Sequence, residues 1–292
     1  MKDPEDINAR LLSRLEILYA RFNRPEWIDP DPLAVAREYH TRADREAAAL
    51  VAAALAFGGV KQIMAAARRA LAPFPRPHAD LLAARPEEIR RACAEFRHRY
   101  VGGAELAALL TGMRGILQEH RSLGALFTRL NTPGGTDIMP ALSRFVRVLG
   151  ADSPLARNYL LPDPARGSAC KRMLLYLRWM VRCDSVDLGL WKGVGPAALV
   201  VPLDIHMHRI CTRLGFTLRR AADLRTAREV TTAFRALRPD DPVRYDFCLT
   251  RASMHAPEAL EDLFAGRQQR RPHRPLGNAG LDPGAGKGFG AT

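Results

Sequence analysis

The sequence contains few cysteines and no long hydrophobic run. Its five cysteines (Cys93, Cys170, Cys183, Cys211 and Cys248) are scattered, odd in number and never arranged as C-x-x-C. This pattern argues against a disulfide framework and against a clustered-cysteine zinc or iron–sulfur site. The longest apolar run, Ala47–Phe57, is too short to cross a membrane, and the polar start MKDPEDINAR does not resemble a secretory signal. We therefore expect a cytoplasmic protein with reduced thiols and no membrane contact.

Lysine is scarce, although the chain is strongly basic. Its 292 residues include 44 lysines and arginines against 31 acidic residues, a formal charge of +13. Such a charge favours polyanionic partners, and nucleic acid is the first to consider. A genome rich in arginine codons would produce the same bias without any function. Because arginine stays protonated and cannot attack an electrophile, the possible amine nucleophiles are few: Lys2, Lys61, Lys171, Lys192 and Lys287.

Two-residue alternation is also absent, whereas helical periodicity recurs along the chain, which predicts an all-α fold. Residues suited to begin a helix are Asp44, Thr136, Ser168, Asp204 and Asp241, and Gly150 and Gly215 are suited to end one. The expected helices cover residues 5–22, 32–39, 43–57, 60–72, 86–95, 104–119, 122–130, 137–149, 168–182, 205–214, 224–237 and 242–254. We expect one helical domain over residues 1–264 and a disordered basic tail, rich in Gly, Pro and Arg, over residues 265–292.

The helix expected over residues 168–182 is basic and amphipathic. On a helical wheel Lys171, Arg178 and Arg182 fall within about 40 degrees of one another, opposite an apolar face formed by Met173, Leu177, Met180 and Val181. The charged face is either simply solvated or a phosphate-binding stripe, and the lack of a carboxylate on it favours the second interpretation. Neighbouring cations and partial burial would also favour the neutral, nucleophilic form of an amine.

The segment VPLDIHMHRICTRLG places an aspartate at the start of the next helix. Asp204 is an expected N-cap, which is a structural role, but a carboxylate fixed there can also serve chemistry beside helix amides that face a phosphate. His206 and His208 are two residues apart and point away from each other on a helix, so we predict no metal site. One histidine is expected to contact phosphate or a base and the other to pack.

This segment resembles the helix-hairpin-helix DNA glycosylase and abasic-site lyase superfamily. PLDIHMHRICTRLG is similar to the superfamily signature V-D-T-H-V-x-R-x-x-x-R-L-G, whose aspartate is catalytic, and the resemblance implies that role for Asp204. The body through about residue 255, with the motifs VDLGLW and DPVRYDF, looks more like a bacterial family described only as a domain of unknown function. The resemblance implies a multi-helix orthogonal bundle with a degenerate hairpin, since only eight residues separate Gly195 from Asp204.

Lyases of the superfamily use a lysine, and two positions compete for that role. The archaeal 8-oxoguanine glycosylases carry theirs on a helix far upstream of the aspartate, which implies Lys171 here. Lys192 in KGVGPAA is nearer to Asp204 in sequence but is expected on a loop. We prefer Lys171 because it is expected on a helix, which would hold its side chain in position. No cofactor is implied.

Further residues are candidates for contact with DNA. Trp191 is the better candidate for a base pocket, whereas Trp179 is expected in the core. Residues 90–100, RRACAEFRHRY, could extend a DNA-binding face, and Asp246 is expected to make ordinary surface interactions. The candidate DNA-binding residues are Arg172, Arg178, Arg182, Lys192, His206 and Arg209.

Three hypotheses follow from these patterns. The first is a monomeric base-excision DNA glycosylase, with possible abasic-site lyase activity, that acts on double-stranded DNA through Lys171 and Asp204. The second is a non-catalytic DNA- or RNA-binding protein on the same scaffold. The third is a helical scaffold whose arginines reflect genome composition. Salt-dependent binding to duplex DNA would separate the third from the first two.

Overall fold

The computed structural model describes residues 4–151 and 158–265, and this part of the chain is mostly helical. The α-helices are α1 (Pro4–Phe22), α2 (Pro32–Arg37), α3 (Arg42–Ala54), α4 (Val60–Leu71), α5 (Pro77–Ala83), α6 (Pro86–Cys93), α7 (Gly103–His120), α8 (Leu123–Leu130), α9 (Met139–Leu149), α10 (Lys171–Val181), α11 (Ile205–Arg213), α12 (Leu224–Leu237), α13 (Asp246–His255) and α14 (Glu261–Phe264). The 3-10 helices are η1 (Pro25–Trp27), η2 (Pro164–Arg166), η3 (Pro196–Ala198) and η4 (Pro257–Leu260). Two short strands, β1 (Arg97–His98) and β2 (Val101–Gly102), form an antiparallel hairpin.

The all-α prediction is confirmed, and every expected helix is present with ends shifted by a few residues. Asp204 is the N-cap of α11 as expected, and Gly215 follows that helix with φ +71°. Other starts differ: Thr41 caps α3 while Asp44 lies one turn inside it, and α10 begins after Cys170 rather than Ser168. Helices α5 and α14 and the β1–β2 hairpin were not expected. The tail predicted for residues 265–292 lies, beyond Ala265, outside the described residues.

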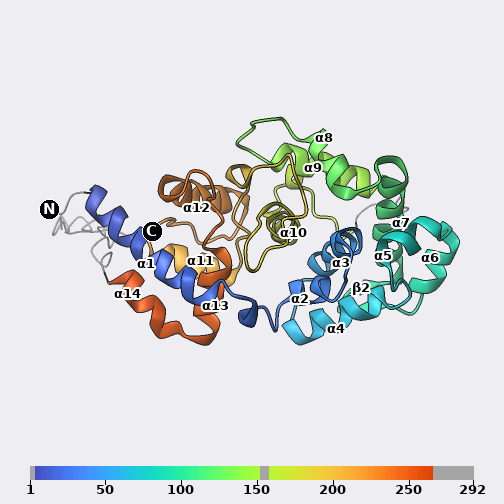
Figure 1. Ribbon diagram of the computed structural model, residues 1–292, viewed down its shortest axis with the longest axis horizontal. Helices are drawn as coiled ribbons and strands as arrows, with labels where there is room; N and C mark the ends of the chain where they lie inside the picture. The colour runs from blue at the N-terminus through green and yellow to red at the C-terminus, as the bar shows by residue number, and fades with distance from the viewer. Residues whose placement is uncertain (1–3, 152–157, 266–292) are drawn as a thin grey trace, which may run out of the picture.

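The first and last helices of the described part of the chain pack against each other. Helix α1 packs against α13 and α14, and this group lies with α11 and α12 at one end of the long axis, whereas α3 to α7 occupy the other end (Figure 1). Helix α10 lies between the two groups and packs against α3 (Figure 1). This arrangement places residues of α2 to α4 opposite residues of α11 and α13.

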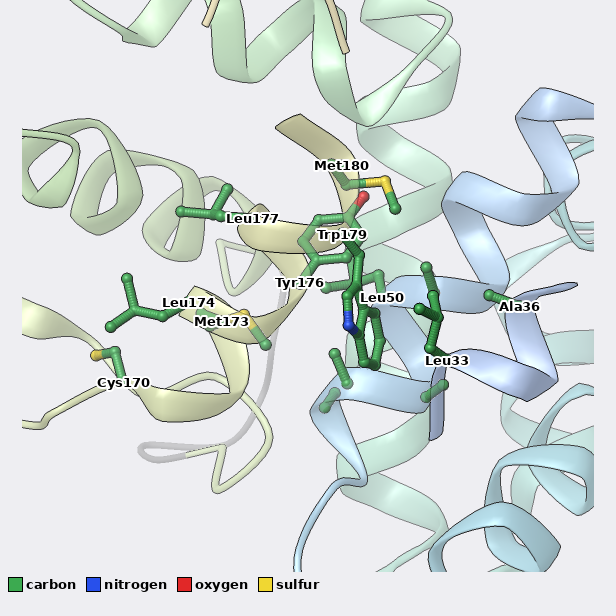
Figure 2. Close-up of a cluster of buried hydrophobic side chains, with 14 of the residues drawn as sticks. Leu33, Ala36, Leu50, Cys170, Met173, Leu174, Tyr176, Leu177, Trp179 and Met180 are labelled. Atoms are coloured by element: carbon green, nitrogen blue, oxygen red, sulfur yellow. The ribbon is translucent and has the colours of Figure 1, made fainter. Parts of the chain in front are cut away.

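Most of α10 is buried, because nearly all of its side chains between Arg172 and Val181 lie in the interior. Tyr176 and Trp179 point toward Leu50 and Leu33 of the neighbouring helices, while Leu174 extends from a different side of α10 (Figure 2). The expected apolar face of Met173, Leu177, Met180 and Val181 is buried, and Trp179 is in the core as predicted. The central helix is therefore fixed by packing along most of its length.

Candidate functional site

Lys171 and Asp204 face each other where α10 and α11 begin. The Nζ of Lys171 lies 3.5 Å from Oδ2 of Asp204, and the two side chains are 39% and 17% exposed. The other carboxylate oxygen, Oδ1, accepts a hydrogen bond of 2.8 Å from the Met207 backbone N–H at the start of α11. One carboxylate oxygen of Asp204 therefore caps α11, as expected, and the other faces the Lys171 amine.

The pair lies on the wall of a cavity of about 360 Å³ between the two groups of helices. Its apolar surface comes from side chains such as Phe57, Leu175 and Phe247, and its charged groups come from four elements. These charged residues are Asp31, Lys171, Arg178, Asp204, Asp246 and Arg251. An apolar pocket with a few convergent charged groups is the usual form of a small-molecule or catalytic site.

Asp246, at the start of α13, is a buried carboxylate of this cavity. Burial raises its pKa to about 6, against the favourable charge of Arg178 and with a further increase from the neighbouring charge of Asp204. Its carboxylate accepts a hydrogen bond from Arg178 Nη1. Asp246 is 5% exposed, so the expectation of an ordinary surface residue is wrong. Sequence spacing does not show that the start of α13 lies against Arg178 of α10.

The expected exposed cationic stripe on α10 is not present beyond Lys171. Arg178 and Arg182 are each 3% exposed and are surrounded by carboxylates. Arg178 pairs with Asp187 and Asp246, and Arg182 pairs with Asp184, Asp187 and Asp241. The prediction that Arg178 and Arg182 bind DNA phosphates is contradicted, because both guanidinium groups are enclosed and paired within the protein. We name these two arginines and the four aspartates the buried ion cluster.

Arg172 is also enclosed within the protein. It donates to the backbone oxygens of Ala54, at 2.6 Å, and Tyr159, and its guanidinium lies over the rings of Phe57 and Tyr159. Burial lowers the pKa of this guanidinium. Arg172 therefore connects α3 and the segment after residue 158 to α10, which corrects its expected role in DNA binding.

Lys192 and Trp191 lie in a different cavity, of about 520 Å³, which also contains Glu46 and Thr128. Lys192 is exposed on a loop, as expected. Trp191 is 6% exposed, stacks on Phe127, and donates a hydrogen bond of 2.6 Å to Glu46 Oε1. The structure therefore brings Lys171, not Lys192, to Asp204, and places Trp191 in a packed wall away from that pair.

The remaining predicted residues lie on α11. His206 faces Ser253 Oγ at 3.2 Å and His208 contacts the backbone oxygen of Arg219 at 2.8 Å, so the two rings diverge as expected. Arg209 is exposed. Between Gly195 and Asp204 the chain contains only η3 and an extended segment, so the second helix of a regular hairpin is missing there.

Sequence comparison assigns the chain to a family. Residues 31–255 match the family described as protein of unknown function (DUF2400), and the chain belongs to that family. No curated protein and no solved structure matches the chain. None of the helices in residues 4–151 and 158–265 has the length and apolar character that crossing a membrane requires.

Proposed function

We propose that this protein is a DNA glycosylase with abasic-site lyase activity, of the helix-hairpin-helix type with a reduced hairpin. The observation that carries the proposal is the Lys171 amine 3.5 Å from the Asp204 carboxylate at a cavity with apolar walls. Lysine is the residue that forms a Schiff base with a sugar aldehyde carbon, and a neighbouring carboxylate can accept the proton that the attacking amine loses.

The proposed reaction begins with attack of the Lys171 nitrogen on C1′ of a damaged nucleoside. The C1′–N bond to the base breaks, and the base leaves with the bonding electrons and is protonated. Asp204 accepts the proton from the lysine nitrogen and, as an anion, stabilises positive charge on the sugar. The C1′–O4′ bond then breaks, O4′ keeps the bonding electrons and takes up a proton, and the lysine nitrogen forms a protonated Schiff base with C1′. Transfer of a C2′ proton to a base then expels the 3′ phosphate by β-elimination.

The cavity fits the size and chemistry of an extruded nucleobase. Its volume of about 360 Å³ lies within the roughly 300–1,000 Å³ of ordinary small-molecule pockets. The rings of Phe57 and Phe247 line it, and aromatic faces can stack on a base that has left the duplex. The charged side chains beside these rings would contact the edges of the base. We propose a monomer that acts on double-stranded DNA in the cytoplasm, with His206 and Arg209 near the DNA backbone.

Borohydride trapping on a duplex that contains an abasic site tests the proposal. We expect the wild-type protein to form a covalent adduct, Lys171→Gln to form none, and Lys192→Gln to form as much as the wild type. Lys192 is a matched control because it is an exposed lysine in a separate cavity. Release of bases from a panel of lesions is measured in parallel, since a glycosylase without lyase activity would release base but form no adduct. Neither adduct nor released base would refute the proposal.

The second candidate is a non-catalytic nucleic-acid-binding protein on the same scaffold. The reduced segment between Gly195 and Asp204 favours it, because a regular second hairpin helix is missing there. This candidate predicts salt-dependent binding to duplex DNA or to RNA with neither adduct nor base release. The same two measurements therefore separate it from the enzyme.

A further inference from the structure

The β1–β2 hairpin ends in an unusual turn. Arg97 pairs with Gly102 and His98 with Val101, so the turn consists of Arg99 and Tyr100 alone. Two-residue hairpin turns favour Asn and Gly because they require positive φ. Here Arg99 adopts φ +54°, a conformation that costs free energy for a residue with a long side chain. Local structure alone therefore does not explain why this turn carries an arginine and a tyrosine.

Tyr100 belongs to an aromatic surface that begins inside the Lys171–Asp204 cavity and continues to solvent. Its ring stacks on Phe57, which lines that cavity, with centroids 5.3 Å apart and an angle of 22°. Tyr159 packs edge-on against Tyr100 at 4.5 Å. Tyr100 is 57% exposed and Tyr159 46%. Large aromatic rings left this exposed and clustered beside a cavity indicate a surface used for contact.

Arg99 extends this surface with a positive charge at the rim of the cavity. Its side chain lies against Gly58, which lines the cavity and has φ +101°; a Cβ atom there would come within 3.1 Å of Arg99 Cδ. Arg99 is exposed, and no carboxylate in residues 8–151 or 158–265 forms an ion pair with it. Arg178 and Arg182, by contrast, each form ion pairs with at least two aspartates. Arg99 thus remains available to an external anion.

We propose that Arg99 and Tyr100 bind duplex DNA beside the extruded nucleotide, with Tyr100 stacked on the base next to the gap and Arg99 on the neighbouring phosphate. This inference rests on the proposed function and names the element that holds the duplex. Extrusion of a nucleotide leaves its neighbours unstacked, and an inserted side chain can replace the lost stacking. An aromatic ring suits this role for any sequence, because every base has a flat face. Phe57 connects this contact to the cavity that would receive the base.

The test measures equilibrium binding to a duplex with a stable tetrahydrofuran abasic analogue and to the same duplex undamaged. We expect Tyr100→Ala to weaken binding to the abasic duplex on the order of ten- to a hundredfold, with a smaller loss on undamaged DNA, and Tyr100→Phe to restore it. Arg99→Gln is expected to weaken binding to both duplexes and reduce the salt slope by about one. Ile17→Ala and Arg10→Gln are matched controls on α1, across the molecule from β2 (Figure 1).

Arg99→Gly separates a binding role from a structural one. Glycine adopts positive φ without strain, so this variant should keep or raise the melting temperature while it weakens DNA binding as Arg99→Gln does. If the wild type forms the trapped adduct but Tyr100→Ala and Arg99→Gly bind both duplexes as tightly as the controls, this inference is wrong and the proposed function stands. If no adduct and no base release occur but these variants lose binding, the enzyme proposal fails and the contact stands. Wild-type protein that binds neither duplex overturns both.

Discussion

The charged face of α10 has two ends that differ in structure although their sequences look alike. At one end Lys171 has one carboxylate partner, at 3.5 Å, and its side chain is 39% exposed. At the other end Arg178 and Arg182 are almost inaccessible and share four aspartates within the buried ion cluster. Basic residues that recur every one or two turns thus form an exposed ion pair at the Lys171 end, here called the open end. At the Arg178 and Arg182 end, here called the closed end, they form an enclosed network.

The difference in burial between Lys171 and the two arginines determines which of these charged groups can leave its protein partner for a ligand. Moving the buried cluster into an apolar interior has a large desolvation cost, which is offset only while every charge keeps its partners. The guanidinium groups there are fixed and cannot turn toward a ligand. Lys171 is partly hydrated and has one long contact, so it can leave Asp204 with little loss. Reactivity is therefore expected at the open end and stability at the closed end.

Removal of a charge from the closed end should produce the largest effect on folding. Arg182→Gln would leave Asp187, which is completely inaccessible, with Arg178 alone. Breaking a buried pair by removing one partner typically costs about 3–5 kcal/mol. We expect a decrease of this size in the free energy of unfolding, measured by urea denaturation. Lys171→Gln is the matched control at the open end, with an expected loss below about 1 kcal/mol. Equal losses in the two variants would show that the two ends do not differ as described.

The helical part of the fold was predictable from local sequence patterns. Apolar periodicity and capping residues such as Asp204 depend on neighbours along the chain, so the helices and the start of α11 could be placed. The β1–β2 hairpin could not, because its strands have two residues each and its turn lacks the usual Asn or Gly. Its residues Arg97, Arg99 and Tyr100 were identified only as part of a basic and aromatic cluster.

The candidate site was predictable only in part, because its partners come from distant segments. Lys171 and Asp204 were found from the helix face and the N-cap position. The aspartates that enclose Arg178 and Arg182 lie on the following loop, before α13 and at its start, so a helical wheel of α10 shows unpaired cations where the fold supplies counter-charges. Absence of a carboxylate from one helix face therefore does not establish an exposed cationic surface.

The pH dependence of stability should report on Asp246, which pairs with Arg178 at the closed end and whose pKa is raised further by the charge of Asp204 at the open end. Its pKa in the folded protein is raised by burial to about 6, from an ordinary value of 3.8. Between these values the folded state binds more protons than the unfolded state, so the contribution of Asp246 to stability is full below pH 4 and is lost as the pH rises to 6. The size of this loss is about 1–3 kcal/mol. Asp246→Asn removes it, so the variant should gain stability relative to the wild type from pH 4 to 6. A constant difference between the two proteins across this range would contradict the shifted pKa.

Substitutions of Asp204 should separate its two functions with the smallest change in stability. Asp204→Ala removes the N-cap of α11 and should lower the free energy of unfolding by about 1 kcal/mol, whereas Asp204→Asn keeps a good cap and should cost only a few tenths. Both variants remove the charge that faces the Lys171 amine. We expect both to slow borohydride trapping on the order of 100-fold or more, since a positioned general base contributes at least that much. If Asp204→Asn keeps the wild-type trapping rate while Asp204→Ala loses both stability and rate, the Asp204 side chain acts only as a helix cap. Asp204 would then not be the general base for Lys171.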